Sequence, residues 1–242
     1  MKPLHEGLLR FPLAWAAALG IAGYSVGAAW LIGPESAWVQ LRPLWGRTVL
    51  KLAGVDVQVM GSEHLVGPAL FVSNHPGYMD AVLPAALMPP KTKWLMKGEF
   101  AQVPVLGRAV KGGAVFVDRK SSAKAREALE SAANTLPDGW SLLIFPEGTR
   151  QRDGHLGAFK KGVFHLALAT GLPIVPIASF GSNRVVPPGG VVVRPGRIDV
   201  DVGAPIATAG WHADELEQRL VDVRAAVQRC AHAAQARWEA AA

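Results

Sequence analysis

The chain has 242 residues, of which half are apolar and eight are tryptophan, and its formal net charge is +6. This length predicts one sizeable domain, alone or with an appendage. The single cysteine, Cys230, excludes an intrachain disulfide and a metal site built from thiolates, and it indicates a reducing compartment.

The positive charge is concentrated in the middle of the chain. Residues 91–161 contain thirteen Lys/Arg and seven Asp/Glu, an excess of +6, so the remainder of the sequence is balanced. Such a segment fits a partner that carries phosphate, such as nucleic acid, anionic lipid, coenzyme A or an acidic carrier protein. A solvated basic face is the alternative interpretation.

The N-terminal region begins with an uncharged apolar stretch, residues 11–33. A helix of this length can cross the hydrocarbon core of a bilayer, and Lys2 and Arg10 precede it. We therefore expect a membrane-embedded helix. A secretory signal peptide and a buried core helix are the alternatives, although no A-x-A cleavage site follows.

A second stretch, residues 36–54, mixes tryptophan and leucine with three cations, Arg42, Arg47 and Lys51. This composition is typical of a segment at the membrane–water interface. Pro34 permits a turn before it, and Pro43 argues against a single unbroken helix. We interpret residues 1–51 as a membrane-anchoring two-helix segment, a hairpin that enters and leaves one leaflet. A single crossing with the N-terminus outside the cytoplasm is the alternative.

Residues 52–242 alternate short apolar runs with helical patterns. Strands are expected at 55–60, 69–74, around 94, and at 114–118, 141–146, 173–179, 191–194 and 198–203, and helices at 120–136, at 158–170 and near the C-terminus. This alternation predicts an α/β domain with a mixed, largely parallel sheet flanked by helices. Functional sites in such sheets gather at the carboxyl ends of strands.

The first polar cluster at a strand end is "NHPGYMD", residues 74–80. If a helix begins near Tyr78, Asp80 lies in its first turn and His75 lies in the loop before it. A carboxylate that binds one imidazole nitrogen leaves the other nitrogen as a base, and Ser73 lies too far back along the strand to be its target. The alternative is that Asp80 caps the helix and His75 bonds only to backbone. One His and one Asp are too few ligands for a metal site.

Two further clusters follow later strands. The cluster Asp118, Arg119 and Lys120 lies at the end of the run 114–118. Arg119 can hold a phosphate through two hydrogen bonds or form a surface ion pair. The turn "FPEGTR" contains Glu147, Gly148, Thr149 and Arg150. Glu147 can accept a hydrogen bond from a polyol hydroxyl, Gly148 permits close approach of a ligand, and Arg150 can clamp an anion.

The clusters occur in the order and spacing of a known motif set. "NHPGYMD", "GGAVFVDR", "FPEGTR" and "LPIVPIA" resemble the four sequence blocks of the PlsC-type glycerolipid acyltransferases, over about residues 55–205. Pro76 and Gly77 depart from the Gln-Ser often found after the histidine in members specific for lysophosphatidic acid. The departure concerns the choice of acceptor and leaves His75 and Asp80 intact.

The resemblance implies the glycerolipid acyltransferase fold and transfer of an acyl group to the sn-2 hydroxyl of 1-acyl-glycerol-3-phosphate, giving phosphatidic acid. It implies that His75 is the general base and Asp80 its orienting carboxylate, with no acyl-enzyme. Substrate-binding roles fall on Arg119, Glu147, Gly148, Thr149 and Arg150, and a weaker pocket role on Pro176.

The same resemblance implies acyl-CoA or acyl-acyl carrier protein as co-substrate, with no further cofactor, no metal and no nucleic-acid partner. It places the enzyme at the inner membrane of a bacterial-type cell with the catalytic domain facing the cytoplasm. Another lysolipid acceptor, such as lyso-ornithine lipid, and a thioesterase or phospholipase that activates water are the alternatives.

Overall fold

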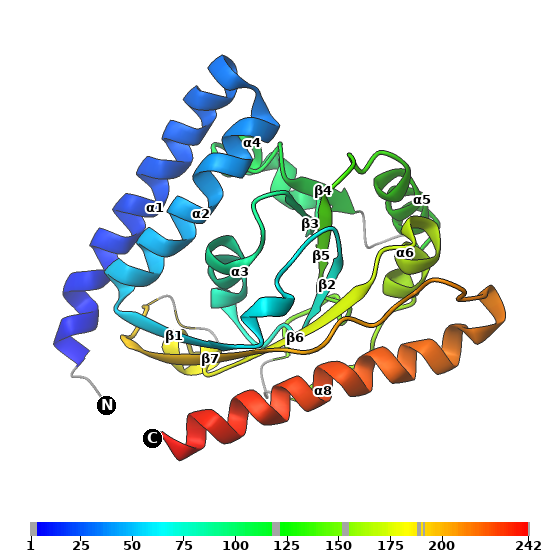
Figure 1. Cartoon of the computed structure of the whole chain (residues 1–242). Coiled ribbons are helices and arrows are strands. Elements are labelled where there is room, and N and C mark those ends of the chain that lie inside the picture. The colour runs from blue at the N-terminus through cyan, green and yellow to red at the C-terminus, as the bar shows by residue number, and fades with distance from the viewer. Residues whose placement is uncertain (1–3, 118–121, 152–154, 188–189, 191, 242) are drawn as a thin grey trace.

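A computed structural model of the chain describes residues 4–117, 122–151, 155–187, 190 and 192–241. Two long helices, α1 (Leu4–Ile32) and α2 (Pro34–Ala53), form an antiparallel hairpin along one side of an α/β body (Figure 1). Gly33 makes the bend with a φ of 83°, and Pro34 is the first residue of α2, where its missing N–H is tolerated. The predicted two-helix segment and its turn are therefore present.

Helix α1 keeps its apolar side chains on the outside of the body. Its segment Pro12–Ile32 has a mean hydropathy of 1.5 and is only 6% buried, so its length and composition suit a membrane span. Trp30 and Leu31 are 88% and 87% exposed. Large exposed apolar side chains in a continuous row mark a surface that meets lipid or protein.

The expectation that Pro43 interrupts the second helix was wrong, because α2 runs unbroken from Pro34 to Ala53. Tertiary contacts outweigh the hydrogen bond that proline removes. The neighbouring Arg42 is 4% exposed and donates to four carbonyl oxygens around the end of α3 (Val82–Leu87), at 2.6–3.1 Å. Packing against α1 on one side and α3 on the other holds this part of α2 in helical form.

The body is built on one seven-stranded sheet with the order β1-β7-β6-β2-β5-β3-β4. All pairs are parallel except β6 with β7, so the sheet is mixed and largely parallel, as predicted. The strands are β1 (Val55–Met60), β2 (Leu70–Ser73), β3 (Thr92–Lys97), β4 (Ala114–Val117), β5 (Ser141–Ile144), β6 (Ile174–Phe180) and β7 (Gly196–Val202).

One predicted strand, 191–194, is not found among the described residues: residues 192–194 are irregular, and residue 191 lies outside them. The next predicted strand, 198–203, is present as β7, which begins at Gly196. A run of valines satisfies a strand pattern, but the paired register of β1 starts opposite Gly196. Sheet pairing, which the local sequence does not contain, therefore decided where this strand begins.

Helices cover both faces of the sheet. On one face Phe71 and Leu143 pack beneath α2 and α3, and on the other Leu70 and Leu142 pack against the remaining large helices. Those helices are α5 (Ser122–Asn134), α6 (Gly162–Thr170) and α8 (Leu216–Ala240). Short elements complete the chain: α4 (Leu106–Ala109), α7 (Ser182–Val185) and the 3-10 turns η1 (Ser62–His64), η2 (Tyr78–Ala81), η3 (Gly98–Gln102) and η4 (Ala213–Glu215).

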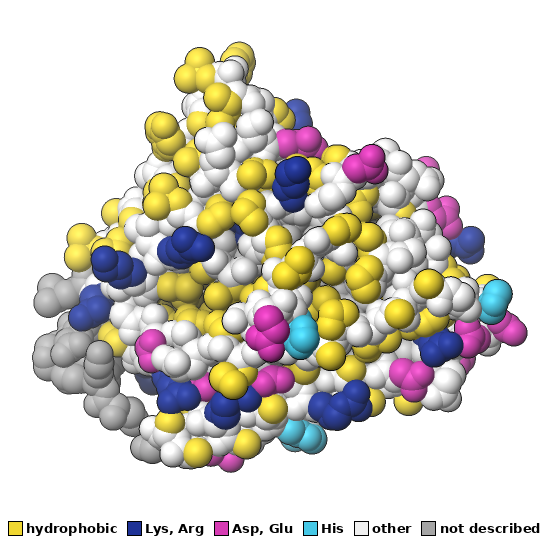
Figure 2. Space-filling model, in the orientation of Figure 1, with side chains coloured by type: hydrophobic (Ala, Val, Ile, Leu, Met, Phe, Trp, Pro, Cys, Tyr) yellow, Lys and Arg dark blue, Asp and Glu magenta, His cyan; other side chains and the backbone are white. Residues whose placement is uncertain are grey.

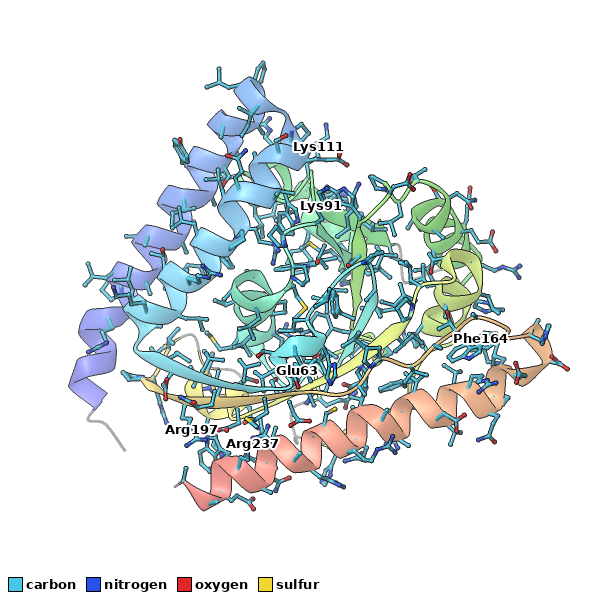
Figure 3. All side chains as sticks on the ribbon, viewed as in Figure 1. Glu63, Lys91, Lys111, Phe164, Arg197 and Arg237 are labelled. Carbon is cyan, nitrogen blue, oxygen red and sulfur yellow. The ribbon has the colours of Figure 1, made fainter. Side chains whose placement is uncertain are left out.

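The C-terminal helix α8 is fastened to β7 by charged side chains. Arg197 of β7 and Arg237 of α8 lie close together (Figure 3), and both reach the fully buried carboxylate of Asp199. Arg237 also binds Asp201 at 2.7 Å. Because Arg237 comes from α8 and its two carboxylate partners come from β7, these ion pairs link the end of α8 to the sheet.

Candidate active site

The loop between β2 and η2 brings the two predicted dyad residues together. Nδ1 of His75 lies 2.9 Å from Oδ2 of Asp80, and the backbone N–H of Gly77 donates to the same oxygen at 2.7 Å. Asp80 therefore both caps the turn and binds the histidine, so the capping role is confirmed and the expectation that His75 bonds only to backbone was wrong. The His75 side chain is 23% exposed, whereas that of Asp80 is 3% exposed. This arrangement holds Nδ1 and leaves Nε2 as the ring nitrogen that is not bound to Asp80.

The histidine ring is also held from its face. Phe145, which follows β5, stacks on His75 with ring centroids 4.5 Å apart and an interplanar angle of 25°. Because β2 and β5 are neighbours in the sheet, their carboxyl ends place the first and third sequence clusters side by side. The imidazole is thus fixed by a carboxylate at its edge and by an aromatic ring on its face.

Burial dominates the electrostatics of Asp80. Loss of solvent raises the pKa of this carboxyl above its ordinary value, while His75 and, less strongly, the Gly77 N–H and the nearby Ser182 hydroxyl oppose the rise. A carboxylate that costs free energy to bury is stabilised by a cation beside it. Asp80 is thus placed to stabilise a positive charge on the His75 ring.

The Glu147 carboxylate accepts hydrogen bonds from two backbone N–H groups. Its Oε1 accepts the N–H of His75 at 2.9 Å, and its Oε2 accepts the N–H of Gly157 at 3.1 Å. The residue is 5% exposed, and burial raises the pKa of its carboxyl. A further backbone hydrogen bond, from Gln151 N–H to His75 O at 2.9 Å, joins the same two loops. In this geometry Glu147 positions the His75 loop; its predicted contact with a substrate hydroxyl stays a prediction.

The last two residues of the "FPEGTR" turn face outward. Gly148 adopts a φ of 72°, which a residue with a side chain rarely takes, so glycine is needed for the turn. Thr149 and Arg150 are exposed, and the Arg150 guanidinium lies 4.0 Å from the centre of the Tyr78 ring. Arg150 is therefore an exposed cation next to the loop that contains His75. Arg119, the other predicted anion-binding residue, lies outside the described residues.

Two residues beside the dyad were not singled out from the sequence. The Asn74 amide pairs with the backbone of Ser179, donating to its O at 3.0 Å and accepting from its N–H at 2.9 Å. Ser182, fully buried, lies beside Asp80. An asparagine directly before the histidine was a signal that could have been used, whereas Ser182 has no signal in the local sequence.

Apolar space adjoins the dyad. A cavity of about 20 Å³ under α3 is bordered by Asp80, Leu83, Leu87 and Phe145. A larger open groove of about 670 Å³ lies between α2, β1 and α3, and Leu87 borders both spaces. Figure 2 shows this groove as a hollowed, largely hydrophobic area with basic side chains at its edge. Arg47 and Lys51 are the cations among the residues that line it.

Known proteins share this sequence pattern and fold. A family model described as Acyltransferase matches residues 56–179, just over half of the chain. A 1-acyl-sn-glycerol-3-phosphate acyltransferase of Limnanthes douglasii is 36% identical over 174 residues, which are 71% of this chain and 62% of that protein. One from Saccharomyces cerevisiae is 31% identical over 226 residues, covering 89% of this chain and 74% of that protein.

A solved structure agrees over nearly the whole length. The crystal structure of the 1-acyl-sn-glycerophosphate (LPA) acyltransferase PlsC from Thermotoga maritima superimposes with a TM-score of 0.79 at 26% identity, covering 97% of each chain. The chain spans 62%, 62% and 56% of the lengths of three plant relatives that it matches. The matched residues 56–179 include His75, Asp80 and the "FPEGTR" turn. The chain therefore belongs to the acyltransferase family.

Proposed function

We propose that the protein is a membrane-bound 1-acylglycerol-3-phosphate O-acyltransferase, which transfers a fatty acyl group to the sn-2 hydroxyl and gives phosphatidic acid. The observation that carries the proposal is the 2.9 Å contact between His75 Nδ1 and Asp80 Oδ2, with Nε2 left for a hydroxyl. The relatives named for this activity, from plant, yeast and mouse, support the choice of acceptor.

In the proposed reaction, Nε2 of His75 removes the proton of the acceptor hydroxyl while Asp80 stabilises the resulting imidazolium. The alkoxide oxygen forms a bond to the thioester carbonyl carbon, and the carbon–sulfur bond breaks. The imidazolium then returns the proton to the departing thiolate. No acyl-enzyme is formed, so both substrates are bound together. Coenzyme A and acyl carrier protein are both suitable carriers of the thiol.

Recognition of the acceptor falls to the mouth of the site. Arg150 over Tyr78 is an exposed cation at the His75 loop and is suited to the acceptor phosphate, together with the predicted contribution of Arg119. Thr149 is exposed beside Arg150 and can add a hydroxyl contact. The groove bordered by Leu87 offers apolar surface for the lipid chains, with Arg47 and Lys51 near lipid phosphates.

We propose that the hairpin dips into the cytoplasmic leaflet of a bacterial-type inner membrane, so that the catalytic domain faces the cytoplasm. A single crossing that starts inside, as Lys2 and Arg10 favour, would place His75 on the side without acyl thioesters. The test is a His5→Cys, Cys230→Ser protein treated with a membrane-impermeant thiol reagent. Protection in intact cells and labelling after lysis support the hairpin, and labelling in intact cells contradicts it.

The function itself is tested by an acyl-transfer assay with a panel of lysolipid acceptors and both donor types. Transfer to 1-acyl-glycerol-3-phosphate above all other acceptors is the expected result. A preference for an unphosphorylated acceptor such as lyso-ornithine lipid would retain the chemistry and refute the substrate. Release of free fatty acid without an acceptor would identify a thioesterase or phospholipase instead.

A further inference from the structure

Two buried polar atoms beside the dyad are unpaired. Oδ1 of Asp80 and Oγ of Ser182 have no hydrogen-bond partner among the described residues, and each is shielded from solvent. Ser182 is nevertheless near enough to lower the pKa of Asp80. Buried polar groups without partners are uncommon in folded proteins, and each needs a physical reason. If the Ser182 side chain changed rotamer so that its hydroxyl donated to Oδ1 of Asp80, one hydrogen bond would satisfy both atoms.

The fold delivers Ser182 to this position through a connected series of contacts. Asn74, next to His75, fastens the end of β2 to the backbone of Ser179 in β6. Gly181 then turns the chain with a φ of 97°, and a Cβ there would lie 2.7 Å from a carbonyl oxygen of Arg197. The turn therefore requires glycine, and it places the next residue, Ser182, against the loop that contains the dyad.

The opposite wall of this contact is Gly77. A Cβ at Gly77 would lie 3.0 Å from Ser182 Oγ, tighter than ordinary contact, so the missing side chain leaves room for the serine. The Gly77 N–H already donates to Oδ2 of Asp80. Oδ2 is thus held by His75 and Gly77, whereas Oδ1 has no partner among the described residues, and Ser182 is the hydroxyl that acts on this carboxyl.

We propose that Ser182 is a positioning residue of the dyad, whose hydroxyl donates to Oδ1 of Asp80 when the site is engaged in catalysis. This role rests on the proposed function of His75 and Asp80. The hydrogen bond stabilises the carboxylate most when His75 is neutral, because a protonated His75 already compensates the charge. Ser182 therefore lowers the affinity of the dyad for a proton and keeps His75 available as a base.

The other charged groups around Asp80 define what the test must hold constant. His75 faces Asp80 from the loop after β2, and Glu147, in the turn after β5, is a second carboxyl whose pKa is raised by burial and, slightly, by the charge of Asp80. Neither group is altered by a substitution at Ser182. A shift in the pH dependence of such a variant therefore reports the loss of the serine hydroxyl.

The experiment compares purified full-length Ser182→Ala and Ser182→Cys with the wild-type protein. Cysteine has the same shape as serine, is slightly larger, and is a weaker donor. Ser141→Ala is the matched control, because Ser141 is also fully buried and its Oγ accepts the Ala69 N–H at 3.1 Å near the start of β2. The measurements are kcat and KM for both substrates, kcat/KM as a function of pH, and urea unfolding. His75→Ala is assayed in parallel.

For Ser182→Ala we expect kcat to fall about tenfold or more, with smaller changes in both KM values. The acidic limb of the kcat/KM profile should move to higher pH by about one unit. For Ser182→Cys, kcat and the position of the acidic limb should lie between those of Ser182→Ala and wild type. Ser141→Ala should be less stable, with its acidic limb unmoved.

An unmoved acidic limb in Ser182→Cys, or in folded Ser182→Ala, overturns the proposed role of Ser182. If Ser182→Ala does not fold, the profile of Ser182→Cys decides. If the acidic limb is unmoved and His75→Ala is inactive, the role of Ser182 is refuted but the proposed function is not. Activity of His75→Ala near wild type refutes the proposed function, and the role of Ser182 with it.

Discussion

Arg42 makes the main polar contacts between the hairpin and the end of α3, and Arg42→Met should lower the free energy of unfolding. Nη1 donates to Pro84 O and Ala85 O, and Nη2 donates to Met88 O and Pro89 O. These carbonyls surround the end of α3, whose preceding turn contains Asp80. The guanidinium also lies 5.6 Å from the ring centre of Trp38 and 5.8 Å from that of Trp94.

The magnitude follows from what each carbonyl retains. Pro84 O keeps a hydrogen bond from Met88 N–H, and Pro89 O keeps one from the Thr92 hydroxyl. Ala85 O cannot receive the next helical hydrogen bond, because Pro89 has no N–H. All four carbonyls lose a charged donor, and two of them, Ala85 O and Met88 O, are left with no partner among the described residues, at about 1–3 kcal/mol each. Because relief of the buried charge offsets part of this, we expect a loss of about 2–4 kcal/mol in the free energy of unfolding.

Urea unfolding of the detergent-solubilised protein measures this loss, and Arg47→Met is the matched control. Arg47 lies on the same helix but is exposed, so its substitution should change the free energy of unfolding by less than about 0.5 kcal/mol. Arg42→Lys keeps the charge but loses the planar guanidinium, so its free energy of unfolding should lie between those of wild type and Arg42→Met. Equal stability of Arg42→Met and Arg47→Met would refute the reasoning.

Three predictions concern the site. Arg150→Ala should raise KM for the acceptor more than for the acyl donor, and the effect should shrink with an unphosphorylated acceptor; equal effects would assign Arg150 another role. Glu147→Gln should lower kcat with little change in the acceptor KM, because it disturbs the His75 loop; a raised acceptor KM would instead support direct substrate contact. Asp80→Asn should be nearly inactive, yet its stability relative to wild type, measured by urea unfolding, should increase as pH rises above 3.8, the ordinary pKa of Asp. The sign follows because the pKa of Asp80 is higher in the folded state than in the unfolded state, so ionised Asp80 destabilises the wild-type fold increasingly as pH rises. A difference in stability between the two proteins that stayed constant with pH would contradict this prediction.

Sequence reasoning succeeded where the local pattern and the structure depend on the same physics. The alternation of apolar runs with helical segments predicted the α/β fold, and the five-residue spacing in "HPGYMD" predicted the contact of His75 with Asp80. Both depend on residues near one another in the chain. The bend at Gly33–Pro34 was readable for the same reason.

The features that sequence reasoning missed depend on residues far apart in the chain. Pro43 stays within a helix because α2 is packed on both sides and Arg42 is bound to α3. Glu147 was expected to face a ligand but holds the N–H of His75, 72 residues away. Ser182 reaches Asp80 only because β6 lies beside β2. Such partners follow from sheet order, which one sequence does not specify.

The central claim is that His75 is the general base, and the acyl-transfer rate of His75→Ala tests it most directly. Single-turnover and steady-state rates should be measured in membranes or detergent with 1-acyl-glycerol-3-phosphate and its acyl thioester, alongside a urea unfolding curve. We predict a folded protein whose rate is lower by about 10²–10⁴-fold, with the acidic limb of the pH profile abolished. Turnover within a few-fold of wild type in a folded His75→Ala protein would contradict the account.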